Sequence, residues 1–247
     1  MMRILRLIIL SWLVLFPALL LAADAPTFAQ GEKLYYIVKW GIVTAGYATL
    51  NVSPETVNGQ SVYHIVSEAR TTSFMDTFYK VRDRNESVVS QEPFCSLNFY
   101  KDLNEGKYHS KETVIFKQQE GKVVYDDATM DMVTGTIDVL AALYYVRMQP
   151  LEENKEFTMP SCNNKKNFEL VVKVKTRKQI EVPAGKFETT MVEPLLKEEG
   201  IFMHTGRLFV YLSNDTRKIP VLLRCKIAVG SISAELLKVE PLAGENK

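Results

Sequence analysis

Apolar and polar residues alternate along most of the chain after residue 32. In residues 168–175, every second side chain from Phe168 to Val174 is apolar, and charged residues stand at three of the positions between and after them. Successive side chains of a β-strand point to opposite faces, so this period predicts a strand with one buried and one wet face. Similar alternation predicts strands at 33–40, 45–52, 61–70, 77–90, 94–103, 107–118, 122–126, 187–195, 206–213, 218–228 and 232–236.

Short turns connect these predicted strands. Asn58-Gly59 lies between two strand segments and is typical of a two-residue hairpin turn, in which both residues have φ > 0. Residues 104–106, 119–121 and 183–185 each end on a glycine and also read as turns. Parallel strands need long crossover connections, so links this short predict an antiparallel meander.

Residues 136–148 break the strand pattern and predict a helix. Thr136 is expected to cap its start, with Asp138 in the first turn and Pro150 beyond its end. Both sides of this predicted helix are apolar, which predicts that the helix is buried or clasped by the sheet. The fold is therefore predicted to be mainly β, a strongly curved antiparallel sheet (an open barrel or a sandwich) around one helix. The predicted helix face comprises Ile137, Leu140, Ala141, Tyr144 and Met148.

The first 23 residues have the layout of a secretory signal peptide. Arg3 and Arg6 precede an apolar run over 7–21, and two alanines follow. A retained anchor helix is the alternative, but a spanning helix needs about 20 apolar residues. This run is shorter and contains Pro17. We expect cleavage after Ala23 and, with no cysteine nearby, no lipid anchor, which predicts a soluble protein outside the cytoplasm.

Beyond the signal peptide, we expect residues 24–247 to form a single β-rich domain. No flexible linker divides them, although one sheet on each side of the helix is an alternative. Cleavage would remove two of the 30 basic residues and none of the 29 acidic ones, so the formal net charge would change from +1 to −1. This balance gives no electrostatic reason to expect binding to nucleic acid or to an anionic membrane.

The sequence offers no recognisable catalytic or metal-binding motif. The histidines, His64, His109 and His204, lie in separate segments and have no metal-ligand spacing. Cysteines occur at Cys95, Cys162 and Cys225, with spacings that match no zinc pattern. We expect buried thiols with at most one disulfide, no cofactor, no metal and no enzymatic activity.

Four segments carry a resemblance to a known family. They are residues 31–50, 136–151, 180–189 and 206–217, which look like an opening strand pair, a helix and two later hairpins. Together and in this order they resemble an exported bacterial family known as a domain of unknown function, DUF3108. Tyr211 stands where that family often has Trp, a change that preserves a strand. The resemblance implies a β-rich cell-envelope protein and supplies no catalytic residues.

Aromatic residues provide the remaining candidate site. They gather in the first predicted hairpin and on the predicted helix, where an ordinary core would also place them. If the curved sheet is incompletely filled, aromatic walls and an adaptable methionine would suit an acyl chain or another apolar ligand. The residues predicted to bind such a ligand are Tyr36, Trp40, Tyr144, Tyr145 and Met148.

Two functions remain open at the level of sequence. The first is a periplasmic module that binds or carries an apolar envelope component such as a lipid. The second is an envelope assembly or scaffold protein that binds a protein or glycan partner. A continuous apolar cavity beside residues 136–148 would favour the first, and a close-packed interior would favour the second.

Overall fold

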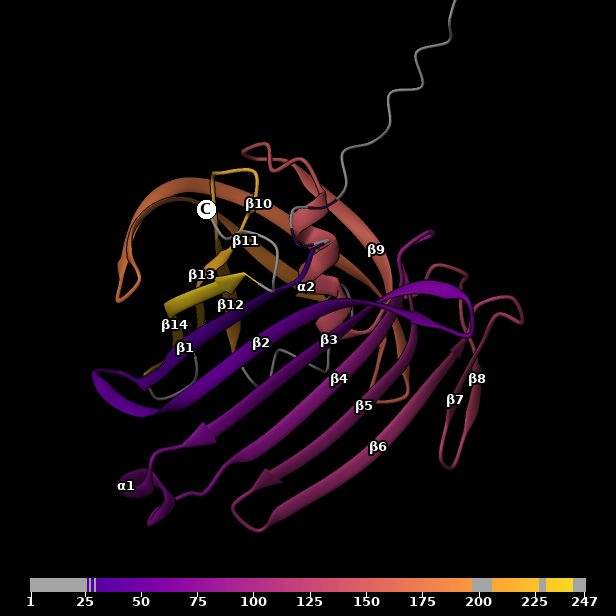
Figure 1. The fold of residues 1–247 in the computed structure, drawn as a ribbon, viewed down its shortest axis with the longest axis horizontal. Helices are drawn as coiled ribbons and strands as arrows, with labels where there is room; N and C mark the ends of the chain where they lie inside the picture. The colour runs from indigo at the N-terminus through magenta and orange to yellow at the C-terminus, as the bar shows by residue number, and fades with distance from the viewer. Residues whose placement is uncertain (1–25, 27, 29, 197–205, 227–229, 242–247) are drawn as a thin grey trace, which may run out of the picture.

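One large antiparallel sheet dominates the described part of the chain, and its strands wrap around a helix (Figure 1). The predicted signal peptide, residues 1–23, lies outside the described residues. The structure is a computed structural model, and it describes residues 26, 28, 30–196, 206–226 and 230–241.

The described residues form fourteen strands and two helices, α1 (Ser73–Asp76) and α2 (Val139–Met148). None of the described helices is both long and apolar enough to cross a bilayer. The strands are β1 (Glu32–Trp40), β2 (Val43–Val57), β3 (Gln60–Thr71), β4 (Arg82–Ser90), β5 (Cys95–Glu105), β6 (Tyr108–Lys117), β7 (Lys122–Tyr125), β8 (Thr129–Asp131), β9 (Glu156–Asn163), β10 (Lys166–Val182), β11 (Gly185–Leu196), β12 (Arg207–Ser213), β13 (Pro220–Lys226) and β14 (Ser231–Pro241).

The strand order confirms the predicted meander. Across the sheet it reads β8-β7-β6-β5-β4-β3-β2-β1-β14-β13-β12-β11-β10-β9, with every pair antiparallel. Every pair except β1–β14 joins strands that follow each other in the sequence. The β2–β3 hairpin turns through Asn58 (φ 50°) and Gly59 (φ 80°), as the Asn-Gly signal predicted.

The sheet curves strongly but stays open between its edge strands, β8 and β9. Side chains and one short extended segment connect these edges instead of a strand ladder. The backbone N–H of Lys165 donates to the Tyr125 hydroxyl (3.1 Å), and the Asn167 side chain donates to Asp131 O. Ile137 forms an isolated parallel bridge to Ser161 on β9. The predicted mainly β fold with an open, barrel-like sheet is therefore confirmed.

Strand β12 is buried on both faces, contrary to its simple period-two pattern. Val210 and Leu212 are buried on one face, and Phe209 and Tyr211 are buried on the other. The β10–β11 hairpin is much longer than its neighbours and bends back over the sheet (Figure 1). Its tip reaches β14, where Ala184 N–H donates to the backbone oxygen of Leu236 (3.0 Å). This long-range contact adds a second layer that alternation alone does not predict.

Helix α2 begins three residues later than the predicted start. Thr136 is not its cap, because the Thr136 hydroxyl donates to Val133 O (2.6 Å). Asp138 is the cap, and its Oδ1 accepts the N–H groups of Leu140 (2.8 Å) and Ala141 (2.9 Å). Residues 136–138 stay extended because they are hydrogen-bonded to β5 and β9. Backbone pairing therefore overrides the local helical pattern here.

One further local prediction is wrong, and two strands were missed. The strand predicted over 77–90 begins only at Arg82, because α1 and a following turn occupy residues 73–81. Asp76 in α1 forms an ion pair with Arg82 (2.6 Å), which holds this turn against the start of β4. The edge strands β8 and β9 were not predicted, since neither has a clear alternating pattern.

Candidate ligand-binding cavity

Helix α2 does not fill the concave face of the sheet, and a cavity of about 350 Å³ remains beside it. Val210, Leu223 and Ala234 are paired across β12, β13 and β14, so their side chains share this face. The lining residues are Val139, Leu140, Ala142, Leu143 and Val146 from α2, and Tyr36, Ala48, Thr49, Leu50, Ser67, Phe168, Leu170, Val172, Val192, Pro194, Leu208, Val210, Leu223 and Ala234 from the sheet.

The chemistry of this lining is almost entirely apolar. Its side-chain polar atoms are the hydroxyls of Tyr36, Thr49 and Ser67, and no lining side chain is charged. The Tyr36 hydroxyl is already engaged, since it donates to Pro220 O (2.8 Å). A ligand here would therefore be held by apolar contact, with few hydrogen bonds to fix its orientation.

Several lining side chains keep accessible surface although they lie inside the curve of the sheet. Leu140 and Leu143 on α2 are only partly buried, as are Phe168, Leu208 and Leu223 on the strands. In a close-packed core, side chains of this size would be covered completely. The space beside the helix is thus lined by apolar surface that the protein does not cover itself.

A buried ion pair fixes the C-terminal end of α2 to β1. Arg147 donates to both carboxylate oxygens of Glu32, and the two side chains are only 1% and 8% exposed. Arg147 also donates to Arg217 O (2.9 Å). Burial opposes the charge of Arg147 and is the largest single influence on its pKa. The hydrogen bond to Glu32 and the Coulombic attraction of Glu32, Tyr144 and Tyr36 together outweigh burial, and the pKa of the guanidinium is raised.

A buried carboxylate fixes the other end of α2. While Oδ1 of Asp138 caps the helix, its Oδ2 accepts the hydroxyls of Ser87 on β4 and Ser96 on β5, both at 2.5 Å. Burial raises the pKa of Asp138, and these hydrogen bonds oppose that rise. Both ends of the helix are therefore clamped to the sheet, which keeps α2 above the cavity.

The structure places only one of the five predicted ligand residues in the cavity wall. Tyr36 on β1 lines it. Trp40 is half exposed at the end of β1, and Met148 is exposed at the end of α2. Whether Tyr36 binds a ligand stays a prediction.

The two helix tyrosines pack elsewhere. Tyr144 is completely buried, with its ring 4.9 Å from that of Phe28 between centroids. Tyr145 packs against Phe94, with ring centroids 6.0 Å apart. The lining residues of α2 that sequence reasoning missed are smaller or aliphatic, such as Ala142 and Leu143, and an apolar pattern does not separate them from ordinary core.

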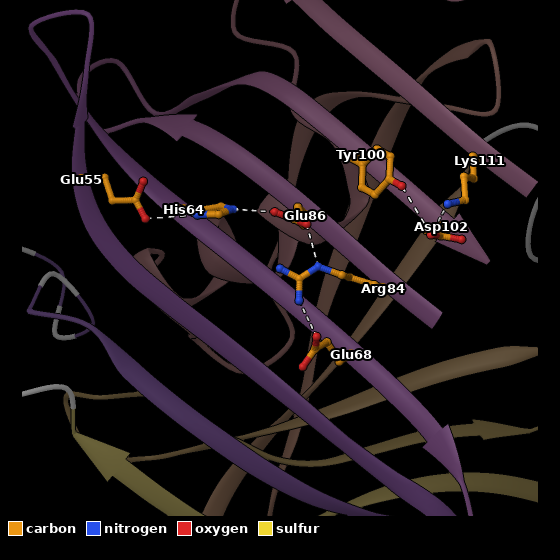
Figure 2. A network of polar contacts seen from close by, with 8 residues as sticks. All are labelled: Glu55, His64, Glu68, Arg84, Glu86, Tyr100, Asp102 and Lys111. Atoms are coloured by element: carbon orange, nitrogen blue, oxygen red, sulfur yellow. Dashed lines mark hydrogen bonds and ion pairs between the residues drawn. The ribbon is translucent and has the colours of Figure 1, made fainter. Parts of the chain in front are cut away.

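A polar network lies on strands β2, β3 and β4, on the face of the sheet that points away from α2 (Figure 2). The ring nitrogens of His64 contact Glu55 (3.1 Å) and Glu86 (2.9 Å), and Arg84 connects Glu86 to Glu68. The hydrogen bond from Arg84 lowers the pKa of Glu86.

The acidic and basic side chains of this network contact one another. Tyr100, Asp102 and Lys111 make a second polar group nearby, with Lys111 3.0 Å from Asp102 (Figure 2). A hollow of about 580 Å³ lies on this face, and charged side chains such as Glu68 and Arg84 line it. Arg84 is paired with Glu68 and Glu86, and Lys111 is paired with Asp102, whereas Arg70 in the hollow forms no ion pair within the described residues. The lining of the hollow is charged, so the cavity beside α2 is the stronger candidate for an apolar ligand.

The remaining sequence candidates form no metal-ligating cluster within the described residues. No group of three metal-ligating side chains occurs there. His109 contacts Asn104 (3.0 Å), and His204 lies outside the described residues. Cys95 and Cys162 are buried free thiols, and burial raises the pKa of both. The Cys162 sulfur lies 3.1 Å from the Tyr125 hydroxyl.

Comparison with one solved structure supports the fold. A β-barrel-like protein of the domain family DUF1849 from Brucella abortus is 12% identical, with a TM-score of 0.59. The similarity covers 87% of this chain and 98% of that one. A protein with a YmcC-like fold from Bacteroides fragilis is also 12% identical, over 87% and 97% of the two chains, with a TM-score of 0.36.

The family comparison covers most of the chain. None of the curated proteins matches it. The family described as "Protein of unknown function (DUF3108)" matches residues 35–237, from within β1 to within β14. This span includes α2 and all of the cavity lining, and the segments that suggested the resemblance belong to one continuous match except for residues 31–34. The protein is therefore a member of the DUF3108 family.

Proposed function

We propose that this protein is a non-enzymatic periplasmic protein that binds or carries an apolar component of the cell envelope, such as a lipid. The observation that carries the proposal is the apolar cavity between α2 and the concave face of the sheet. Its volume of about 350 Å³ lies near the lower end of the range for small-molecule sites, roughly 300–1,000 Å³. The layout of residues 1–23 supports the periplasmic location.

The composition of the lining supports an apolar ligand over a polar one. A sugar or peptide would lose hydrogen bonds to water and find few replacements on the side chains of this cavity. An acyl chain loses none, and it gains about 25 cal/mol for each Å² of apolar surface that it buries. A scaffold protein would have no need to keep this apolar surface uncovered by its own side chains.

Filling the cavity should abolish ligand uptake. Ala142→Phe adds a ring from the helix side, and Ala234→Phe adds one from the sheet side. We expect each variant to lose at least tenfold in affinity for N-phenyl-1-naphthylamine, an uncharged apolar dye, because the ring occupies the space of the ligand. Dye fluorescence measures the affinity, and native mass spectrometry of detergent-free protein tests for a retained ligand.

Val57→Phe provides the matched control. It adds the same ring at an exposed position at the end of β2, away from the cavity, and should leave dye binding unchanged. A wild-type protein that shows a clean apo mass and takes up neither dye nor acyl probes would refute the proposal. Thermal unfolding of each variant shows whether a loss of dye binding arises because the variant no longer folds.

A further inference from the structure

Three turns of the sheet and the start of β14 lie at one end, which we call the aromatic rim. The rim comprises the β1–β2, β3–β4 and β5–β6 turns and the first residues of β14, and antiparallel pairing brings all of them to the same end. Figure 1 shows the first three along the left and lower edge of the molecule. Backbone hydrogen bonds join each segment to the next: Gly41 N–H to Ser231 O (2.9 Å), Thr72 N–H to Ala45 O (2.9 Å) and Gly106 N–H to Lys80 O (2.7 Å).

The rim exposes large apolar side chains at its tips. Ile42, in the β1–β2 turn beside Gly41 (φ 59°), is 97% exposed, although turn positions normally carry polar residues. Phe74 and Phe78 are 64% and 71% exposed, with their rings in edge contact at 5.4 Å between centroids. Other exposed apolar residues on the rim are Trp40, Val43, Tyr79, Tyr108 and Ile232.

Packing within the protein does not account for these side chains. Each of the three most exposed residues leaves most of its surface in water, where it costs free energy instead of contributing to the core. Clustering at one end distinguishes them from the single exposed apolar residues found on most proteins. They therefore indicate an interaction surface.

Positive charge accompanies the apolar tips. Arg70, Lys80 and Lys107 are exposed on the rim, and none of them forms an ion pair within the described part of the chain. Two carboxylates also lie on the rim: Asp76 is paired with Arg82, and Glu105 ends β5 next to the β5–β6 turn. The balanced charge of the whole chain thus conceals a local excess of cations at this end.

This combination fits a lipid interface better than a protein surface. The tips protrude from separate turns, so a protein partner would need a matching socket for each, whereas the interface of a bilayer adapts to all of them. Aromatic and aliphatic side chains next to lysine and arginine are typical of segments that lie in the headgroup region. Each cation near an anionic leaflet contributes further attraction.

We propose that the aromatic rim docks this protein on the anionic surface of a membrane. Ile42, Phe74 and Phe78 enter the interface, and Arg70 and Lys80 lie near the lipid phosphates. This inference goes beyond the proposed function and does not depend on it, because the rim can bind a membrane whether or not the cavity holds a ligand.

Vesicle flotation tests the docking surface. The exported protein, expressed with its own N-terminal segment and purified from the periplasm, is mixed with vesicles of phosphatidylethanolamine and phosphatidylglycerol or of phosphatidylcholine alone. Wild type should float with the anionic vesicles, and the triple variant Ile42→Ser/Phe74→Ser/Phe78→Ser should bind at least about tenfold less. Replacing Arg70, Lys80 and Lys107 by Gln should remove at least about tenfold of the binding to anionic vesicles and most of its salt dependence.

The control removes exposed apolar residues away from the rim. Val57→Ser/Ile115→Ser/Val133→Ser should bind vesicles as wild type does, because none of these positions lies on the rim. Docking is refuted if wild type stays in the lipid-free fraction, or if the Ile42, Phe74 and Phe78 triple variant floats as well as wild type. Self-association of wild type without vesicle binding, lost in that variant, would assign the rim to a second copy instead. Dye uptake by the cavity is unaffected by either result, so the two proposals fail separately.

Discussion

Replacing Arg147 by Met should lower the free energy of unfolding by roughly 3–5 kcal/mol, because the carboxylate of Glu32 is then buried without a partner. Met keeps much of the aliphatic bulk between the rings of Phe28 and Tyr144, which lie 5.0 and 5.1 Å from the guanidinium carbon. The loss therefore reports the charge and not a cavity. Urea unfolding followed by circular dichroism measures it.

Two comparisons isolate the electrostatic cause. The double variant Glu32→Leu/Arg147→Met removes both charges and should recover most of the loss, since apolar replacement of a buried ion pair is often neutral or stabilising. Lys186→Met breaks the exposed pair with Glu181 and should cost less than about 1 kcal/mol. If the double variant is no more stable than Arg147→Met alone, the unpaired charge of Glu32 does not cause the loss of stability in Arg147→Met.

Asp138→Ala should be about as destabilising, by roughly 3–5 kcal/mol. The change removes the cap of α2, worth about 1 kcal/mol. It also leaves the buried hydroxyls of Ser87 and Ser96 without their acceptor, and an orphaned buried polar group costs about 1–3 kcal/mol. Since this clamp holds the start of α2 above the cavity, dye uptake should fall together with stability.

Thr136→Ala is the matched control, because the sequence pattern alone favours Thr136 as the cap. Its hydroxyl bonds only to Val133 O, so the variant should lose about 1 kcal/mol or less. Equal losses for Thr136→Ala and Asp138→Ala would contradict the observed cap.

The stability of the wild type should also depend on pH through Asp138. Burial raises the pKa of this carboxyl, so the folded state holds the proton more tightly than the unfolded state does. Its contribution to stability is therefore smaller above the folded pKa, and it increases as pH falls through that pKa toward the unfolded value of about 3.9. Asp138→Asn does not titrate, so wild type should gain stability relative to it when urea unfolding is repeated from pH 7 to pH 4.

Local patterns predicted most of the strands because a strand's period and its turn residues are written in adjacent positions. Asn58-Gly59 forms the turn that its residue types require, and the period from Phe168 to Val174 lies within β10. Prediction failed where a segment distant in the sequence supplies the hydrogen-bond partners of the backbone. Residues 136–138 are helical by pattern but extended in the protein, because β5 and β9 bind their backbone groups.

In the candidate site, the contrast between features set by local sequence and features set by distant contacts is larger. A single arginine in an otherwise apolar helix was a signal of a buried charge, but its partner Glu32 is 115 residues away. The aromatic chemistry of Tyr144 and Tyr145 predicts contact with a ligand, yet the helix turns them toward Phe28 and Phe94 and away from the cavity. Periodicity identifies a helix that is apolar all round, and it does not reveal which side meets empty space.

By itself, the sequence determined the secretory layout of residues 1–23, the antiparallel meander, a central apolar helix and the family resemblance. These follow from runs, periods and turn residues that act over a few neighbouring positions. The tertiary structure alone decided where α2 begins, which charges are buried, and that a cavity remains beneath it. Those features depend on the volume and the hydrogen-bond partners that remain once distant strands have packed together.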